Sequence, residues 1–342
     1  MSEVLPVCTL YSRTVMGYRT GKQADSVQDV RRYPHIIFLL HCNLERLCGF
    51  HNLSIFINVC DYLVNTRGMD HKMEKKKQVI LVVGSCGLDR LLTVAQYPIA
   101  DAKVRTTGYN EVGGGNAANT ASTMGFLKDA TFLKEQNISV KFVSKVGDDS
   151  VGQQLINELE ESNVETLFCK GPPRSNTAFT TIIVSEKEHT RTCIHTPGSC
   201  GEISESDLGT FNMDEVFENV VHLHSDSRNT VACLFFAREA RARGIKVSCD
   251  CEKDRKTTAL DELIQIADIL FTNSSHLGPY LDRLDLDLEE VNSRQSLPKV
   301  SVVADSLNEY TSYIDLYAKS LAPSAFFMRW YSQFEKEVIV TQ

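Results

Sequence analysis

From residue 78 onward, short and nearly continuous apolar runs alternate with amphipathic stretches. Apolar runs rich in β-branched residues are typical of strands that a parallel sheet buries on both faces. The predicted strands cover 78–83, 140–147, 220–225, 245–252, 267–273 and 336–341, and the predicted helices cover 117–127, 150–162, 229–243 and 258–266. The alternation predicts an α/β fold with a mostly parallel central sheet flanked by helices.

Two β-branched segments interrupt this alternation. Residues 177–184 and 190–195 are rich in threonine, valine and isoleucine, and the polar sequence SEKEH joins them. Such a pair is typical of a β-hairpin rather than a strand–helix–strand unit. Residues 103–112 are expected to pair with this hairpin. We therefore expect a small β-strand lid over about 103–112 and 177–195.

The sequence GGGNAANTA at 113–121 places a glycine triplet and two asparagines where a helix is expected to begin. Glycine lets main-chain amides approach a hydroxylated or anionic ligand. Asn116 and Asn119 lie three residues apart, so a helix beginning here places both on one face of its first turn. A tight strand-to-helix turn requires glycine whether or not a ligand binds. Both interpretations of the triplet therefore stay open.

An acidic residue follows the first predicted strand. Residues 78–83 are followed by GSCGLD, which places Asp89 just past the strand end. Open α/β sheets bind ligands at this edge. Aspartate is also common as the cap of a turn, so Asp89 is a candidate ligand residue with a structural alternative.

Composition and charge favour a globular protein and disfavour nonspecific binding to nucleic acid or to membranes. The chain has 342 residues, of which 42% are apolar, and this length allows a full core. Its net charge of -8 disfavours nonspecific binding to nucleic acid or to anionic membranes. The apolar runs at 36–40 and 53–64 fall short of the roughly 20 residues that a membrane span needs. Residues 1–72 lack a clear period and are expected to be an N-terminal extension, with the folded domain at 73–342.

The 11 cysteines are scattered and show no metal-ligand spacing. No signal peptide is evident, so we expect reduced thiols in a cytoplasmic protein and no structural metal.

These features, in this order, resemble the ribokinase/PfkB family of carbohydrate kinases, most closely its ketohexokinase-like branch, over roughly residues 78–342. Each segment by itself is a weak signal, whereas the co-linear order is specific. The segments are GLD at 87–89, GGGNAANTA at 113–121, VGDDSVGQQLINELEESNVET at 146–166, TRTCIHTPG at 190–198, HSDSRN at 224–229 and IKVSCDCEK at 245–253. The resemblance implies a ribokinase-like fold with a β lid.

The resemblance also implies an ATP-dependent transfer of the γ-phosphoryl group, with Mg²⁺, to a hydroxyl of a sugar or similar polyol. Carboxylates and amides suit this task because they bind adjacent hydroxyls together. The implied sugar-binding residues are Asp89, Gly114, Gly115, Asn116 and Asn119, with Asp226 and Arg228 near the acceptor end of the site and Glu252 and Asn273 near the nucleotide. A homodimer through the lid is a further expectation. Judged from the residues alone, Asp226 and Arg228 are equally compatible with a surface ion pair.

Some positions depart from the family pattern. Gly87 stands where ribokinases carry a sugar-binding asparagine, and His276 stands where many members carry glutamate. The GAGD motif, whose aspartate takes the proton from the attacking hydroxyl, occurs nowhere in the 342 residues. We therefore expect a C-terminally truncated kinase domain without this catalytic residue. The alternatives are a non-catalytic sugar-binding or dimerising fragment and a nucleoside kinase of the same family.

Overall fold

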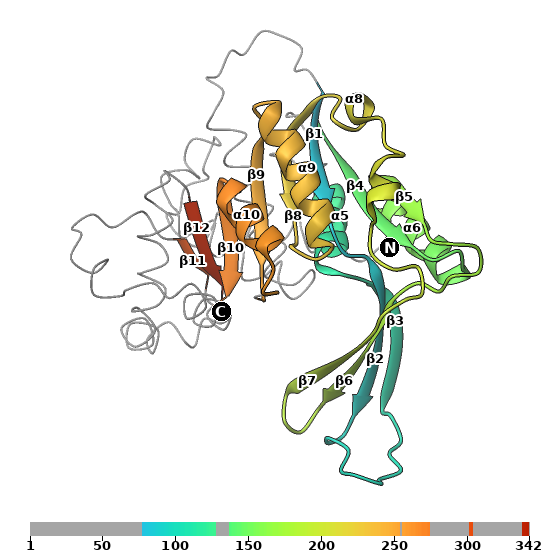
Figure 1. Ribbon diagram of the computed structural model, residues 1–342. Helices are drawn as coiled ribbons and strands as arrows, with labels where there is room; N and C mark the ends of the chain where they lie inside the picture. The colour runs from blue at the N-terminus through green and yellow to red at the C-terminus, as the bar shows by residue number, and fades with distance from the viewer. Residues whose placement is uncertain (1–76, 128–136, 254, 274–300, 304–336, 342) are drawn as a thin grey trace, which may run out of the picture. The chain divides into compact units, whose positions relative to one another are not determined.

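The computed structural model describes residues 77–127, 137–253, 255–273, 301–303 and 337–341 (Figure 1). The extension expected at 1–72 lies outside the described residues, and so does His276. The boundary placed at residue 73 therefore stays a prediction.

A parallel sheet forms the centre of the fold. Among the described residues it has eight strands, in the order β11-β12-β10-β9-β8-β1-β4-β5, and every pairing within it is parallel. The strands are β1 (Gln78–Val83), β4 (Ile138–Val146), β5 (Val164–Lys170), β8 (Val220–Ser225), β9 (Lys246–Cys251), β10 (Ile269–Asn273), β11 (Ser301–Val303) and β12 (Glu337–Thr341). β1 is buried along its whole length, as its unbroken apolar run predicted.

The sequence did not predict β5 or β11. β5 reads VETLFCK and has two buried positions, with half-buried and exposed ones between and after them. It lies at one end of the strand order in the described sheet, so it has a neighbouring strand on one side only. An end strand with a partly solvated face lacks the continuous apolar run that marked the central strands.

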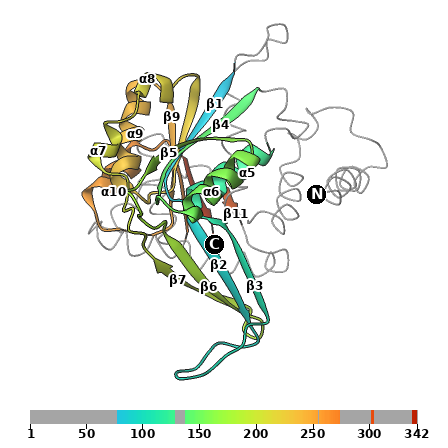
Figure 2. The same ribbon diagram turned by 90° about the vertical axis from the view of Figure 1, so that its right-hand side faces the viewer.

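The helices cover both faces of the sheet. α9 and α10 lie on one face in Figure 1, and the turned view in Figure 2 places α5 and α6 on the other. No helix in the described ranges is long and apolar enough to cross a membrane. The helices are α5 (Asn116–Leu127), α6 (Ser150–Glu161), α7 (Glu205–Leu208), α8 (Met213–Val216), α9 (Thr230–Ala242) and α10 (Thr258–Ile266).

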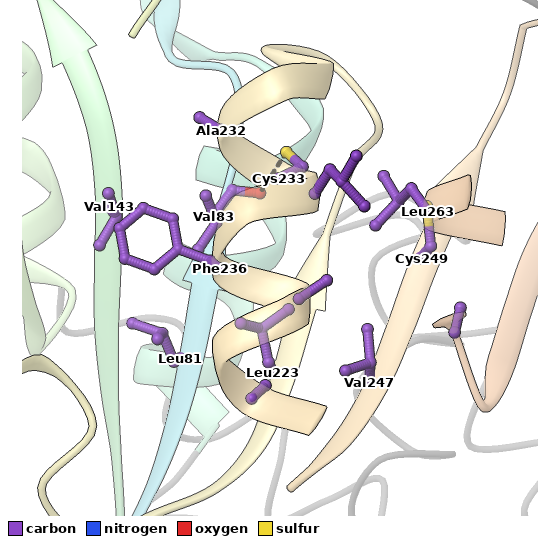
Figure 3. Close-up of a cluster of buried hydrophobic side chains, with 14 of the residues drawn as sticks. Leu81, Val83, Val143, Leu223, Ala232, Cys233, Phe236, Val247, Cys249 and Leu263 are labelled. Carbon is purple, nitrogen blue, oxygen red and sulfur yellow. Dashed lines mark hydrogen bonds between the residues drawn. The ribbon is translucent and has the colours of Figure 1, made fainter. Parts of the chain in front are cut away.

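The core between α9 and the sheet is drawn in Figure 3. Phe236 of α9 is fully buried and meets the ring of Phe211 edge-on, with ring centroids 5.6 Å apart. The Cys233 thiol lies 3.7 Å from the Val83 carbonyl oxygen, to which it donates. The sheet contributes Leu81, Val83, Val143, Leu223, Val247 and Cys249 to this cluster. The core fixes α9, and with it the turn that connects β8 to α9.

The lid is a second sheet, which has four strands in the order β3-β2-β6-β7. Its strands are β2 (Gly87–Val94), β3 (Gly108–Gly114), β6 (Phe179–Ser185) and β7 (Thr190–Thr196). The predicted hairpin is confirmed, because β6 and β7 pair antiparallel. The prediction for 103–112 was wrong in its bounds and in its partner, since β3 begins at residue 108 and pairs with β2 rather than with the β6–β7 hairpin. GLD at 87–89 forms no turn but opens β2, because β3 and β6 hydrogen-bond to it on both sides.

Candidate functional site

The three glycines before α5 each lie against different protein atoms. The Gly113 amide donates to Glu158 Oε2 at 2.9 Å. A Cβ at Gly114 would overlap the Asp89 carboxylate, and Gly115 has a φ of +99°, in the left-handed region that favours glycine. A Cβ at Gly113 would also lie 2.7 Å from Glu158 Oε2, so close packing accounts for Gly113 and Gly114 and backbone conformation for Gly115. At Gly114 the packing partner is itself a candidate ligand residue.

Asp89 lies on one face of the lid, close to the strand-to-helix turn. Along the register it is opposite Val112 on one side and Thr180 on the other, and Thr180 is opposite His195. The hydroxyl of Thr180 lies 3.3 Å from His195 Nδ1. Burial raises the pKa of Asp89, although the Thr180 hydroxyl and the nearby His195 partly oppose this. A half-buried carboxylate of this kind gains from hydroxyl donors on a ligand.

The charges of Asp89 in the lid and of Arg228 after β8 act on His195 in opposite directions. Burial lowers its pKa, the positive charge of Arg228 lowers it further, and Asp89 opposes both effects. No role for His195 was predicted from the sequence, because it occurs within a hairpin whose residues alternate between two faces. Only the pairing of β7 with β6 places it in the row that contains Asp89.

The first turn of α5 carries both asparagines. α5 begins at Asn116, and the Asn119 amide donates to the Gly115 carbonyl at 2.8 Å. Asn116 Nδ2 donates to Glu252 Oε2 at 2.9 Å. Both asparagine side chains are half-buried. The predicted helix start is confirmed to within one residue, and Asn116 contacts a residue that the resemblance had placed near the nucleotide.

Asp226 fastens three parts of the chain together. It is 0% exposed, and its Oδ2 accepts from the Ser85 amide at 3.0 Å, from the Ser85 hydroxyl, and from the Ala117 amide at 3.0 Å. Its Oδ1 accepts from the Arg228 amide at 3.0 Å. Burial raises its pKa, while the bonds from Ser85 and Ala117 and the charge of Asp250 act in opposite directions. The surface ion pair that the sequence allowed is wrong, because Asp226 is buried and meets only the backbone of Arg228.

The Arg228 side chain pairs with Glu252 instead. Arg228 Nη2 donates to Glu252 Oε1 at 3.0 Å, so that both oxygens of Glu252 accept from protein donors. Burial alone would raise the pKa of Glu252, but the Asn116 amide and the Arg228 charge outweigh it and hold the pKa below its usual value. Glu252 directly follows β9, and Asn273 ends the adjacent β10, so both belong to the same edge of the sheet.

A second polar cluster fastens the lid to the central sheet. Asp149 precedes α6, and its carboxylate accepts from the Gly152 amide at 2.8 Å, the Thr177 amide at 2.9 Å and the Thr177 hydroxyl at 2.7 Å. The Thr177 hydroxyl also accepts from the Gly147 amide at 2.9 Å. β6 begins two residues later at Phe179. The sequence predicted a helix at 150–162, whereas the cap formed by Asp149 and its contact with Thr177 come from the structure.

The described residues contain no group of three or more histidine, cysteine and carboxylate side chains placed to hold a metal ion. Glu252 also has both carboxylate oxygens engaged by Asn116 and Arg228. These residues by themselves therefore do not form a site for Mg²⁺, and a magnesium ion would depend on oxygens brought by a ligand.

The sheet order and the lid define an α/β fold with a small β lid, and the polar cluster lies at the carboxyl ends of β1, β8 and β9. The chain belongs to the pfkB family of carbohydrate kinases, whose sequence profile matches residues 77–303. It is 26% identical over 204 residues to an ATP-dependent ribose-1-phosphate kinase of Halopiger xanaduensis, covering 59% of this chain and 64% of that protein. It is 29% identical over 110 residues to the ribokinase of Bacillus subtilis, covering 32% of this chain and 34% of that protein.

The fold agrees with that of a solved ribokinase from Giardia lamblia. The TM-score is 0.50 at 16% sequence identity, and the match covers 65% of this chain and 63% of the other. The ribokinase-like fold predicted from the sequence is therefore confirmed. The chain spans less than two thirds of the length of each of these three proteins. The closer relation to the ketohexokinase-like branch stays a prediction.

Proposed function

We propose that this chain carries the acceptor-binding part of an ATP-dependent kinase that transfers the γ-phosphoryl group to a sugar hydroxyl. The observation that carries the proposal is that the Asp89 carboxylate lies against Gly114, two residues before α5, while Asn116 of α5 contacts Glu252 and Glu252 contacts Arg228. These groups come from the lid, a helix N-terminus and the carboxyl edge of the sheet, where open α/β folds bind ligands. Relatives named as ribokinase and ribose-1-phosphate kinase support the substrate class.

In this proposal each group has a distinct task. The Asp89 carboxylate accepts from adjacent sugar hydroxyls, and the amides of Gly114 and Gly115 and the side chains of Asn116 and Asn119 complete the binding of the polyol. ATP with its magnesium ion supplies the phosphoryl group. Phosphoryl transfer depends chiefly on positioning and on charge stabilisation, so fixing the acceptor hydroxyl is the contribution of these residues.

Fewer observations support ligand contacts by Asp226, Arg228 and Asn273. A direct sugar contact by Asp226 stays a prediction, and its four protein donors favour the role of holding α5 in place. Arg228 is the better candidate for a ligand contact, because 41% of its side chain is exposed. Asn273 is proposed for the nucleotide side because β10 ends there.

An ADP-release assay on the 342-residue chain tests the proposal. The panel contains ribose, ribose-1-phosphate, fructose and adenosine, each with ATP and Mg²⁺. We expect calorimetry to show binding of one of the sugars and the loss of this binding in Asp89→Ala, because the carboxylate supplies charge-assisted hydrogen bonds to the acceptor. ADP release would show that a residue other than the aspartate of the absent GAGD motif accepts the proton. Asp214→Ala is the matched control, since Asp214 has 89% of its side chain exposed and forms a surface ion pair with Arg243.

The outcomes separate the alternatives. Calorimetric sugar binding without ADP release would favour a non-catalytic sugar-binding protein. Release with adenosine alone would favour a nucleoside kinase. Sugar affinity that is unchanged in Asp89→Ala would refute the assignment of Asp89 to the acceptor site.

We also propose that the lid forms a homodimer contact. Tyr109 of β3 and Ile194 of β7 lie on the same face of the lid, on its two outer strands, with 61% and 51% of their surface exposed, and exposed apolar side chains favour association. Sedimentation of the purified chain should show a dimer that Ile194→Lys dissociates. A monomeric wild-type chain would contradict this proposal.

A further inference from the structure

Among the described residues, Asn116 and Arg228 each donate a hydrogen bond to a different carboxylate oxygen of Glu252. Oε2 accepts from Asn116 Nδ2 at 2.9 Å, and Oε1 accepts from Arg228 Nη2 at 3.0 Å. Arg255 lies further away, with its Nη2 3.9 Å from Oε1. Because an ionised carboxylate only accepts hydrogen bonds, the Asn116 atom that faces it must be the amide nitrogen.

This contact determines what Asn116 presents to a ligand. A carboxamide is planar, so fixing Nδ2 against Glu252 also fixes the direction of Oδ1. Asn116 is the first residue of α5, directly after Gly115, where a sugar is proposed to bind. An asparagine without this partner rotates about its terminal torsion, which has broad minima, and a ligand then has to stop that rotation on binding.

We propose that Glu252 is a positioning residue of the acceptor site: it orients the Asn116 carboxamide so that Oδ1 accepts from a sugar hydroxyl, and Arg228 holds Glu252 ionised and in place. This inference rests on the proposed function. It departs from the resemblance, which assigned Glu252 to the nucleotide. A half-exposed ion pair with no further task contributes little, so the contact with Asn116 is what gives Glu252 its effect on binding.

Glu252→Gln tests the inference with almost no change in shape. Both oxygens of Glu252 accept, so the new amide group must turn its own donor toward either Asn116 or Arg228. We expect about 10-fold weaker binding of the panel member that the wild type binds, by calorimetry, which corresponds to one lost hydrogen bond. ADP affinity should not change. Glu262→Gln is the matched control, because Glu262 pairs with Arg238 on the surface at 2.6 Å.

Exchanging the carboxylate and the carboxamide between positions 252 and 116 should restore sugar binding. In the double variant Glu252→Gln with Asn116→Asp, the amide at position 252 donates to the carboxylate at position 116 and its oxygen still accepts from Arg228. The second carboxylate oxygen at position 116 still accepts from a sugar. We expect the double variant to regain most of the lost affinity. Should Glu252→Gln fail to fold, Glu252→Asp serves instead, because the shorter side chain keeps the charge but no longer reaches Asn116.

The outcomes are distinct. Sugar affinity that falls in Glu252→Gln and recovers in the double variant supports the inference. Sugar affinity equal to that of the wild type, a loss confined to ADP, or a double variant weaker than Glu252→Gln overturns it while leaving the proposed function intact. A wild-type chain that binds no member of the panel refutes the proposed function, and this inference with it.

Discussion

Replacing Asp226 with asparagine exchanges one buried acceptor oxygen for an amide group. In the native protein Oδ2 accepts from the Ser85 amide, the Ser85 hydroxyl and the Ala117 amide, and Oδ1 accepts from the Arg228 amide. The side chain is 0% exposed, so water does not replace a lost partner. An asparagine has one oxygen, and its NH₂ group must therefore face at least one backbone N–H.

The magnitude follows from the less costly of the two orientations. With the asparagine oxygen at the Oδ2 position, the bonds from Ser85 and Ala117 survive and only the Arg228 amide loses its acceptor. One buried N–H without an acceptor costs about 1–3 kcal/mol, and the surviving bonds lose their charge assistance. Removing a buried charge offsets part of this, since burial already raises the pKa of Asp226. We expect a net loss of about 2 kcal/mol in the free energy of unfolding.

Urea unfolding at pH 7, followed by far-UV circular dichroism, measures this loss as a lower midpoint with an unchanged m value. Asp214→Asn is the matched control, because Asp214 is exposed and its pair with Arg243 should be worth less than about 0.5 kcal/mol. Amide hydrogen exchange should speed up at Arg228, whose N–H loses its acceptor. A loss no greater than in Asp214→Asn, with native exchange at Arg228, would show that Asp226 does not hold these segments together.

Three further variants test the turn and the lid. Gly114→Ala should weaken sugar binding about 10-fold by displacing the Asp89 carboxylate, whereas Gly209→Ala has only ordinary van der Waals neighbours and should change nothing; equal affinities would contradict the first statement. Thr177→Val should lower the free energy of unfolding by about 1–3 kcal/mol, and a neutral result would argue against its hydrogen bonds as the lid anchor. Burial raises the pKa of Asp149, but the hydrogen bonds from Thr177 outweigh this effect and lower the pKa overall. The ionised Asp149 carboxylate therefore stabilises the folded state fully above about pH 4, and this stabilisation is lost as the pH falls through the folded-state pKa. The urea midpoint of Asp149→Asn should therefore fall less steeply with acid than that of the wild type, and equal slopes would refute this.

The sequence predicted those strands and helices whose hydrophobic pattern can be recognised within one segment, without knowledge of its neighbours. β1 and β8 are short apolar runs, and a strand buried on both faces needs little else to be identified. The strand at β5 and the strand at β2 were missed. Charged or polar residues interrupt the apolar sequence of both segments. They form strands because β6 pairs with β2 and β4 pairs with β5.

Some features of the candidate site were also predictable from local sequence, whereas others depend on tertiary packing. The glycine triplet and the start of α5 follow from local conformational requirements, and composition with motif order was enough to indicate the family. The role of Asp226 did not follow, because an aspartate after a strand has the same appearance whether it faces a ligand or is buried. Its four donors come from three separate segments, and only their packing shows that it is buried.

The sequence by itself therefore determined the α/β class, most of the central strands and helices, the lid hairpin and the family. The tertiary structure alone decided which polar groups meet. Asn116 and Glu252 are 136 residues apart, and Ala117 and Asp226 are 109 apart. Backbone conformation is encoded within a few residues, whereas contacts at such separations depend on the order of the strands in the sheet, which no local pattern specifies.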